Sequence, residues 1–164
     1  MIEKSLEANI ISAIQALNLA GLSVRGMWQP VASGNVAGEE DASSPAALVV
    51  RVSPRGFDTF GVSVASFTVT MSLVVRVDLC PTGTAIETFA EPIAALLQKW
   101  NLTLNCANDC GLGVDGEFVP GGIQVPSGDG PTFDEESCVW SVIFSFTVRG
   151  AVVEAEPETV TTNT

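Results

Sequence analysis

The sequence contains no histidine and no tyrosine, and only seven of its 164 residues are lysine or arginine. Histidine is the side chain that most often acts as a general base, activates a nucleophile or binds a metal near neutral pH. No Gly-x-Ser-x-Gly elbow and no Ser-x-x-Lys pair supplies a substitute nucleophile. These absences predict a protein that is not an enzyme.

Basic residues are also too few for a nucleic-acid-binding protein. Nineteen acidic residues against seven basic ones give a formal net charge of −12. Proteins that bind DNA or RNA need clustered lysine and arginine to displace counterions from the phosphate backbone. A protein of this charge repels a phosphate backbone instead, so we expect no specific nucleic-acid binding.

Long apolar runs are missing from the N-terminal stretch MIEKSLEANIISAIQAL, which carries Glu3 and Glu7. We therefore expect neither a signal peptide nor a membrane span there. An intracellular start favours reduced thiols over disulfides. The redox state of the cysteines stays open, because an oxidising environment would permit bridges among some of them. The four are Cys80, Cys106, Cys110 and Cys138.

Apolar residues make up 46% of the chain and charged residues only 16%. At this length the composition predicts one globular domain over residues 1–153, followed by a disordered tail over 154–164. Apolar residues at three- and four-residue spacing predict a first helix over 3–19, ended by Gly21.

The same spacing predicts a second helix from Pro81 to Trp100. Thr84 and Glu87 have the spacing of a capping box at its start. Pro92 lies inside the apolar pattern and removes one backbone donor, which predicts a kink or a restart there.

Apolar residues that alternate with polar ones predict strands, and the opposite phase of Val62 and Val64 predicts a bulge near Ala65 and Ser66. The predicted strands cover residues 22–28, 46–53, 67–79 and 140–149. Two glycine-rich polar stretches lie between these elements: 30–45 predicts a long loop or an extended hairpin tip, and 101–137 predicts a long loop with one short hairpin.

This order of elements predicts an α+β fold, an antiparallel β-sheet of about four to five strands with two helices packed on one face and long loops. The apolar faces of the strands then meet both helices. The opposite face carries Arg51, Arg76 and Arg149. Such a face is either solvated or meets acids of a neighbouring subunit.

The stretch CANDCGLGVDGE at residues 106–117 combines three suggestive patterns. Cys106 and Cys110 form one cysteine pair, but a structural zinc site needs a second pair. The glycines spell Gly-x-Gly-x-x-Gly, but neither a strand before them nor a helix after them is expected. The nearby acids lack the spacing of a calcium loop. We therefore predict no metal and no cofactor.

Three stretches resemble the tail terminator, or tail completion, proteins of long-tailed phages. They are the opening helix, the long strand with its following helix in FTVTMSLVVRVDLCPTGTAIETFAEPIAALLQKW, and the closing strand CVWSVIFSFTVRG. The resemblance covers a little under half of the chain and rests on pattern, since this family has no fingerprint motif. The long loops depart from its more compact members.

The resemblance implies a non-enzymatic virion subunit, assembled in the host cytoplasm. It forms a ring, usually a hexamer in this family, that ends the tail tube and joins it to the head connector, with DNA passing through the lumen unbound. The implied partners are therefore further copies of this chain and the tube and connector proteins, with no membrane contact. Candidate residues for ion pairs between subunits are Arg51, Arg55, Arg76 and Arg149 with Glu39, Glu40 and Asp41.

Two alternatives stay open. One is another ring of the same particle, such as a head–tail connector or a tail tube subunit. The other is a small metal-dependent enzyme that uses the acidic loop over residues 106–136.

Overall fold

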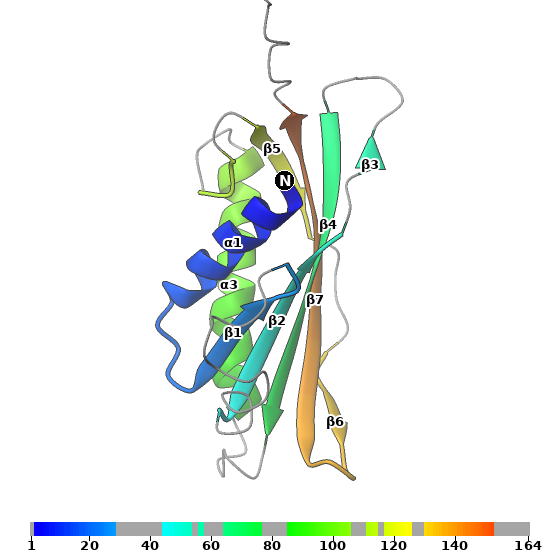
Figure 1. Cartoon of the computed structure of the whole chain (residues 1–164). Coiled ribbons are helices and arrows are strands. Elements are labelled where there is room, and N and C mark those ends of the chain that lie inside the picture. Colours follow the sequence, from blue (N-terminus) through cyan, green and yellow to red (C-terminus); the bar gives the residue numbers. More distant parts are fainter. Residues whose placement is uncertain are drawn as a thin grey trace, which may run out of the picture.

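The computed structural model describes residues 2–28, 44–53, 56–57, 64–76, 85–105, 111–114, 117–125 and 130–152. Within these ranges the chain forms two helices and seven strands (Figure 1). They are, in chain order, α1 (Ile2–Gln15), β1 (Leu22–Gly26), β2 (Ala46–Val52), β3 (Gly56–Phe57), β4 (Val64–Arg76), α3 (Ala85–Asn105), β5 (Phe118–Gln124), β6 (Thr132–Asp134) and β7 (Val139–Val152).

The strands form one open sheet whose main path runs β1-β2-β4-β7-β5. The short strands lie beside the two longest ones, β3 on β4 and β6 on β7. Every pairing is antiparallel except that of β1 with β2, which is parallel. The predicted α+β class is confirmed, with a sheet that is mixed but mostly antiparallel.

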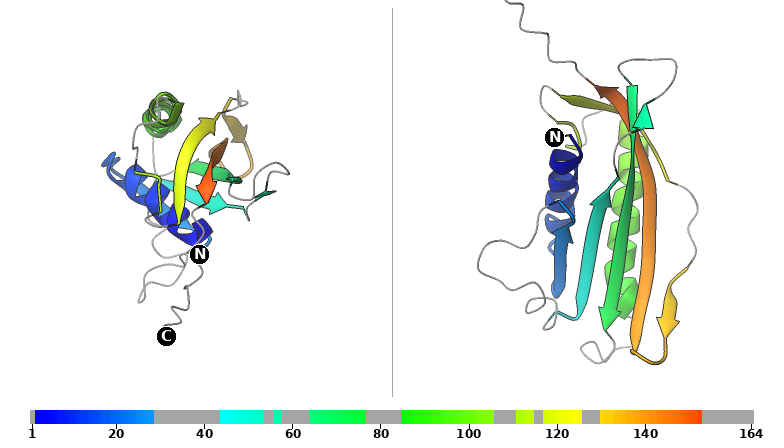
Figure 2. Two further views of the ribbon diagram at one scale, coloured as in Figure 1. Left: turned by 90° about the horizontal axis from the view of Figure 1, so that it is seen from above. Right: turned by 45° about the vertical axis from the view of Figure 1, so that its right-hand side comes forward.

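Both helices cover the same face of the sheet, as the edge-on view in Figure 1 shows and the turned views in Figure 2 confirm. Helix α1 packs on β1 and β2, while α3 packs mainly on β5 and also contacts β4 and β7. The two helices and the sheet therefore enclose one core, as the sequence predicts.

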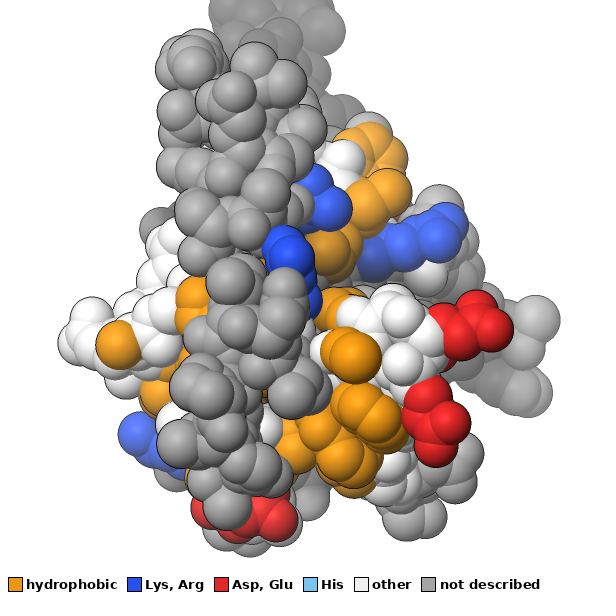
Figure 3. All heavy atoms as spheres, turned by 90° about the horizontal axis from the view of Figure 1, so that it is seen from below, with side chains coloured by type: hydrophobic (Ala, Val, Ile, Leu, Met, Phe, Trp, Pro, Cys, Tyr) orange, Lys and Arg blue, Asp and Glu red, His pale blue; other side chains and the backbone are white. Residues whose placement is uncertain are grey.

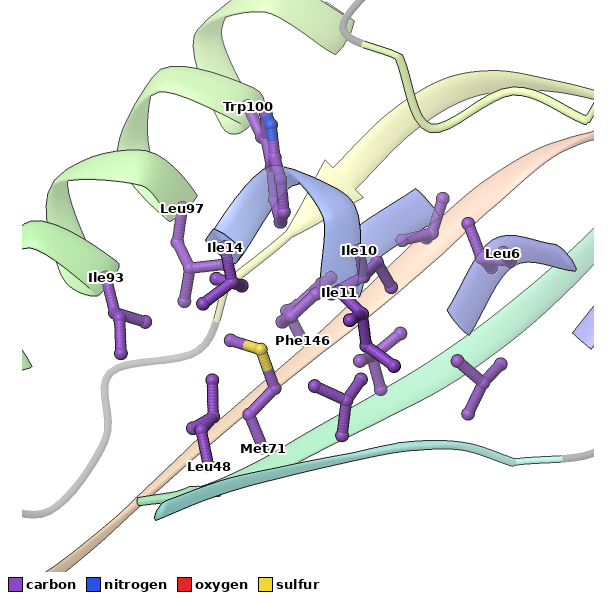
Figure 4. Close-up of a cluster of buried hydrophobic side chains, with 14 of the residues drawn as sticks. Leu6, Ile10, Ile11, Ile14, Leu48, Met71, Ile93, Leu97, Trp100 and Phe146 are labelled. Atoms are coloured by element: carbon purple, nitrogen blue, oxygen red, sulfur yellow. The ribbon is translucent and has the colours of Figure 1, made fainter. Parts of the chain in front are cut away.

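The core is built from the helix stripes and the inward residues of the strands. Figure 4 shows Ile10 and Ile14 of α1 and Leu97 of α3 above Met71 of β4 and Phe146 of β7. All five side chains are buried. Burial of such side chains removes apolar area from water and is the main favourable contribution to folding.

Helix α1 ends at Gln15, four residues before the predicted end. Its last turn tightens through a bond from the Leu17 N–H to the Ile14 carbonyl, and Asn18 then takes a left-handed conformation (φ 52°). Gly21 is left-handed too (φ 83°), but it lies at the start of β1. There a Cβ would come within 2.7 Å of Pro45. Asparagine tolerates this conformation, which is why the helix ends before the glycine.

Helix α3 runs without a break from Ala85 to Asn105, through Pro92. The predicted restart at Pro92 is therefore wrong, and the helix extends five residues beyond Trp100. Its buried stripe continues on both sides of the proline, with Phe89 before it and Ile93 after it. Packing of this stripe on the sheet offsets the loss of one backbone donor. Thr84 of the predicted cap lies outside the described residues.

The predicted bulge near Ala65 and Ser66 is wrong. Strand β4 pairs with β7 in unbroken register from Val64 to Arg76, and Ala65 continues the buried phase of Phe67. The irregularity lies instead in β5, where the register with β7 shifts between Pro120 and Gly122. A proline cannot donate to the ladder, so it is tolerated at an edge or a bulge, and β5 provides both.

The predicted loop over residues 101–137 is partly wrong. It contributes the end of α3 and the strands β5 and β6, both of which pair with β7. Leu112 and Phe118 are fully buried in the core, and the Asn9 amide donates a 2.8 Å hydrogen bond to the Gly113 carbonyl. The hairpin predicted within this stretch is not the β6–β7 pair, because β7 begins at Val139; inside the stretch, Val114 and Phe118 form an isolated antiparallel bridge.

Candidate interaction surface

The face of the sheet that points away from α1 and α3 is called here the outer face. Its position follows from the register, because directly opposed residues of paired strands point to the same side. On β4 the inward residues are buried and the alternate ones are exposed or half-buried. The outer-face residues of the described strands include Ser23, Arg25, Val49, Arg51, Ser66, Thr68, Thr70, Ser72, Val74, Arg76, Ile143, Ser145, Thr147 and Arg149.

Hydroxyl side chains form rows across the centre of the outer face. Thr68 of β4 lies opposite Thr147 of β7, and Thr70 lies opposite Ser145. Thr70 also lies opposite Arg51 of β2, so that this row spans three strands. Short hydroxyl side chains project little from this face, which suits contact with a partner surface.

The predicted arginines do share this face. Arg51 of β2 and Arg149 of β7 are exposed, and Arg76 at the end of β4 is half-buried. Arg149 lies opposite Ser66 of β4, and Arg76 lies opposite Val139 of β7. The sequence prediction therefore places Arg51, Arg76 and Arg149 on the correct face, because period-two alternation assigns a face to each strand residue.

Arg25 of β1 is a fourth arginine on this face, which the sequence analysis did not single out. It lies opposite Val49 of β2, two residues from Arg51, and is half-buried. From the spacing of strands and residues, the Cα atoms of Arg25 and Arg51 are about 8 Å apart. The alternation of Leu22 and Val24 with Arg25 indicates that Arg25 lies on the polar face of this strand. The strand is too short, however, for its sequence to indicate which strand it pairs with.

The outer face has the opposite charge to the protein as a whole. The described strands carry these four arginines and one acid, Asp134 at the end of β6. Figure 3 views the molecule end-on, from below, and shows several basic side chains with hydrophobic and polar groups between them and acidic side chains beside them. In a chain of net charge −12, this concentration of positive charge makes the outer face the most distinctive surface of the described residues.

Apolar side chains lie among these polar groups. Ile143 of β7 is 60% exposed and lies opposite Ser72, in the same row as Val49 and Arg25. An exposed isoleucine on the outer face, in the part of β7 between its pairings with β6 and β5, is a contact that a partner can bury. The outer face thus combines hydroxyl and apolar groups with arginine, a residue that is enriched in protein interfaces.

Four of the seven candidate interface residues cannot be placed. Arg55, Glu39, Glu40 and Asp41 lie outside the described residues, so the predicted pairing of arginines with this acidic segment stays a prediction. The predicted loop over 30–45 and the predicted tail over 154–164 also lie outside them, apart from residues 44 and 45.

The glycine pattern in the 106–117 stretch is followed by strand β5 and not by a helix. A dinucleotide-binding loop needs a helix N-terminus at that place, so its rejection on the sequence agrees with the fold. Cys106 and Cys110 lie outside the described residues, as does Cys80. Cys138 is exposed, and its thiol donates to the Glu135 carbonyl. No group of three metal-ligating residues occurs in the part of the chain that the structure describes.

A buried glutamate fixes the end of β1 beside the outer face. Glu7 of α1 is fully buried, and its Oε1 atom accepts a 2.7 Å hydrogen bond from the Trp28 backbone N–H. The Trp28 indole N–H in turn donates to the Val52 carbonyl at 3.2 Å. A Cβ on Gly26 would overlap the Glu7 carboxylate, so a larger residue there would require this carboxylate to move. These contacts hold β1 and β2 in place behind Arg25 and Arg51.

Fold and surface together define a two-layer α+β domain that has helices on one face and an arginine- and hydroxyl-bearing sheet on the other. Neither helix of the described residues is long and apolar enough to cross a membrane. No protein-family model matches the chain, and no curated protein matches it.

Proposed function

We propose that this protein is a non-enzymatic structural subunit that assembles with further copies of itself. The observation that carries the proposal is the outer face, an array of arginine, hydroxyl and apolar groups in an otherwise acidic chain. The five strands of its main path span roughly 700 Å² at the usual strand spacing and rise. Stable interfaces bury about 800 Å² on each partner, so this face has the size of one.

The kind of assembly comes from the resemblance of the opening helix, the long strand with its helix and the closing strand to phage tail terminator proteins. On that basis we propose a ring that ends the tail tube and joins it to the head connector in the virion. A net charge of −12 suits such a ring, because an acidic lumen lets DNA pass without binding it.

Another ring of the same particle, a connector or a tube subunit, is consistent with the same outer face and stays the alternative. The metal-dependent enzyme is less well supported. Within its proposed loop over 106–136, Leu112, Phe118 and Ile123 are core residues and β5 and β6 belong to the sheet.

Native mass spectrometry and negative-stain electron microscopy of the purified chain test the proposal. We expect a closed ring with a defined number of subunits. A chain that is monomeric up to high micromolar concentration and binds a stoichiometric metal ion would contradict the structural role and favour the enzyme.

A further inference from the structure

We propose that the outer face of one copy binds the acidic side of helix α3 of the next copy, with Glu87 and Glu91 paired to Arg25 and Arg51. This proposal rests on the proposed self-assembly and adds the surfaces that meet, their relative orientation and the residues that pair.

The outer face is not suited to bind a second outer face. Its described strands carry four arginines and one acid, Asp134, so two copies related by a twofold axis would bring this basic face against itself. Juxtaposed like charges cost several kcal/mol in an interface. The partner surface must therefore be a different, acidic part of the chain, or an acidic molecule of another kind.

Helix α3 presents such a surface on the side that faces away from the sheet. Its buried stripe contains Phe89, Ile93 and Leu97, whereas Glu87 and Glu91 are exposed. Residues four apart on a helix have Cβ atoms about 6 Å apart, so the two carboxylates form a pair on one turn. Ala95, one turn further along, is also exposed and is small enough to allow close approach of a sheet. Lys99, after one more turn, is exposed and basic, so the acidic part of this side is its N-terminal half.

The spacing of the two pairs matches. Arg25 and Arg51 are diagonal neighbours on β1 and β2, about 8 Å apart at the backbone. The long arginine side chains span the remaining difference from the 6 Å spacing of the glutamates. Each planar guanidinium binds one carboxylate through two hydrogen bonds, which lysine does not do. Val49 lies opposite Arg25 on the outer face, and Ile143 lies in the same row, where they add apolar contact.

The two surfaces lie on opposite sides of the protein, because α3 covers the inner face of the sheet (Figures 1 and 2). A contact between opposite sides is heterologous, and each copy can then bind one neighbour on each side. Repetition of such a contact closes into a ring or extends as a filament. The proposed pairing therefore gives the symmetry of assembly that the proposed function requires.

Charge-reversal variants test the pairing. Arg25→Glu with Arg51→Glu reverses the charge at these positions of the outer face, and Glu87→Arg with Glu91→Arg reverses the charge at the paired positions of the helix. Each double variant is expected to weaken self-assembly about tenfold or more, measured by sedimentation velocity over a concentration series. An equimolar mixture of the two is expected to assemble in alternation, because each reversed surface then meets its complement. The matched control, Glu135→Arg with Glu136→Arg, changes two exposed acids in the β6–β7 turn and is expected to assemble as the wild type does.

Circular dichroism and the melting temperature verify that each variant folds. Assembly of either double variant at wild-type affinity would overturn the pairing, and so would an equimolar mixture that stays dissociated. Neither result would contradict the proposed function. A wild-type chain that is monomeric throughout would overturn the proposed function itself. Binding of a mixed-sequence oligonucleotide by the wild type, abolished by Arg25→Glu with Arg51→Glu, would assign the outer face to nucleic acid and overturn the pairing.

Discussion

Strands β5 and β7 approach each other closely, and from this we predict how alanine substitution of two nearby glycines changes the stability of the fold. Gly150 of β7 is buried and lies opposite Pro120 of β5. A Cβ at this position would overlap the Val119 carbonyl oxygen and come within 2.8 Å of the Pro120 Cα and 2.9 Å of the Phe118 ring. Two of these contacts are backbone atoms of β5, so a rotamer change cannot relieve them and the strand itself must move.

We expect Gly150→Ala to destabilise the fold by about 2 kcal/mol, within the usual range for overpacking. For a chain of this length the change corresponds to a melting temperature roughly 4–8 °C lower. Gly121 provides the matched control, since a Cβ there has no neighbour closer than 3.8 Å, the Arg149 carbonyl oxygen. Gly121→Ala is expected to be neutral or to stabilise by up to about 1 kcal/mol, because alanine restricts the unfolded chain.

Differential scanning calorimetry of both variants measures the effect, and hydrogen exchange in β5 locates it. The reasoning would be refuted by a Gly150→Ala protein that melts within about 1 °C of the wild type. Equal losses in both variants would refute it too, because the effect would then not come from the close approach at Gly150.

Three further predictions concern the core and the thiol. Glu7→Ala removes the acceptor of the Trp28 N–H and is expected to cost about 1.5–3 kcal/mol by urea denaturation, with a smaller loss for Glu7→Gln, which keeps an acceptor oxygen. Phe67→Ala removes a fully buried ring that lies edge-on to Phe118 at 5.0 Å, and the same assay is expected to show a loss of about 3–5 kcal/mol. Cys138 is exposed and is expected to react with a maleimide in the native protein; peptide mapping that finds it unlabelled would contradict its placement.

The sequence predicts best where one period dominates a long segment. The stripe of α1 and the alternation in β4 and β7 identify the helices, the central strands and the face on which Arg51 and Arg149 lie. These features depend on residues that are close in sequence and on the burial of one side of the element. A periodic pattern of apolar residues indicates both.

Features that depend on distant residues were predicted less well. Strand β5 contains Pro120 and two glycines, so its sequence predicts a loop. It is a strand because it pairs with β7, which its own sequence does not indicate. The run of α3 through Pro92 depends on packing against the sheet. The parallel pairing of β1 with β2 has no local signal either, and it is this pairing that brings Arg25 beside Arg51.

Hydroxyl-radical footprinting tests the central claim, that the outer face is buried when copies of the protein assemble. Ile143 is 60% exposed in the isolated chain, and Cys138 in the β6–β7 turn serves as an internal reference. We predict that oxidation of Ile143, relative to Cys138, falls severalfold between dilute monomer and concentrated assembly. Equal oxidation of Ile143 in a fully assembled sample would contradict the claim, because the outer face would then be solvated in the assembly.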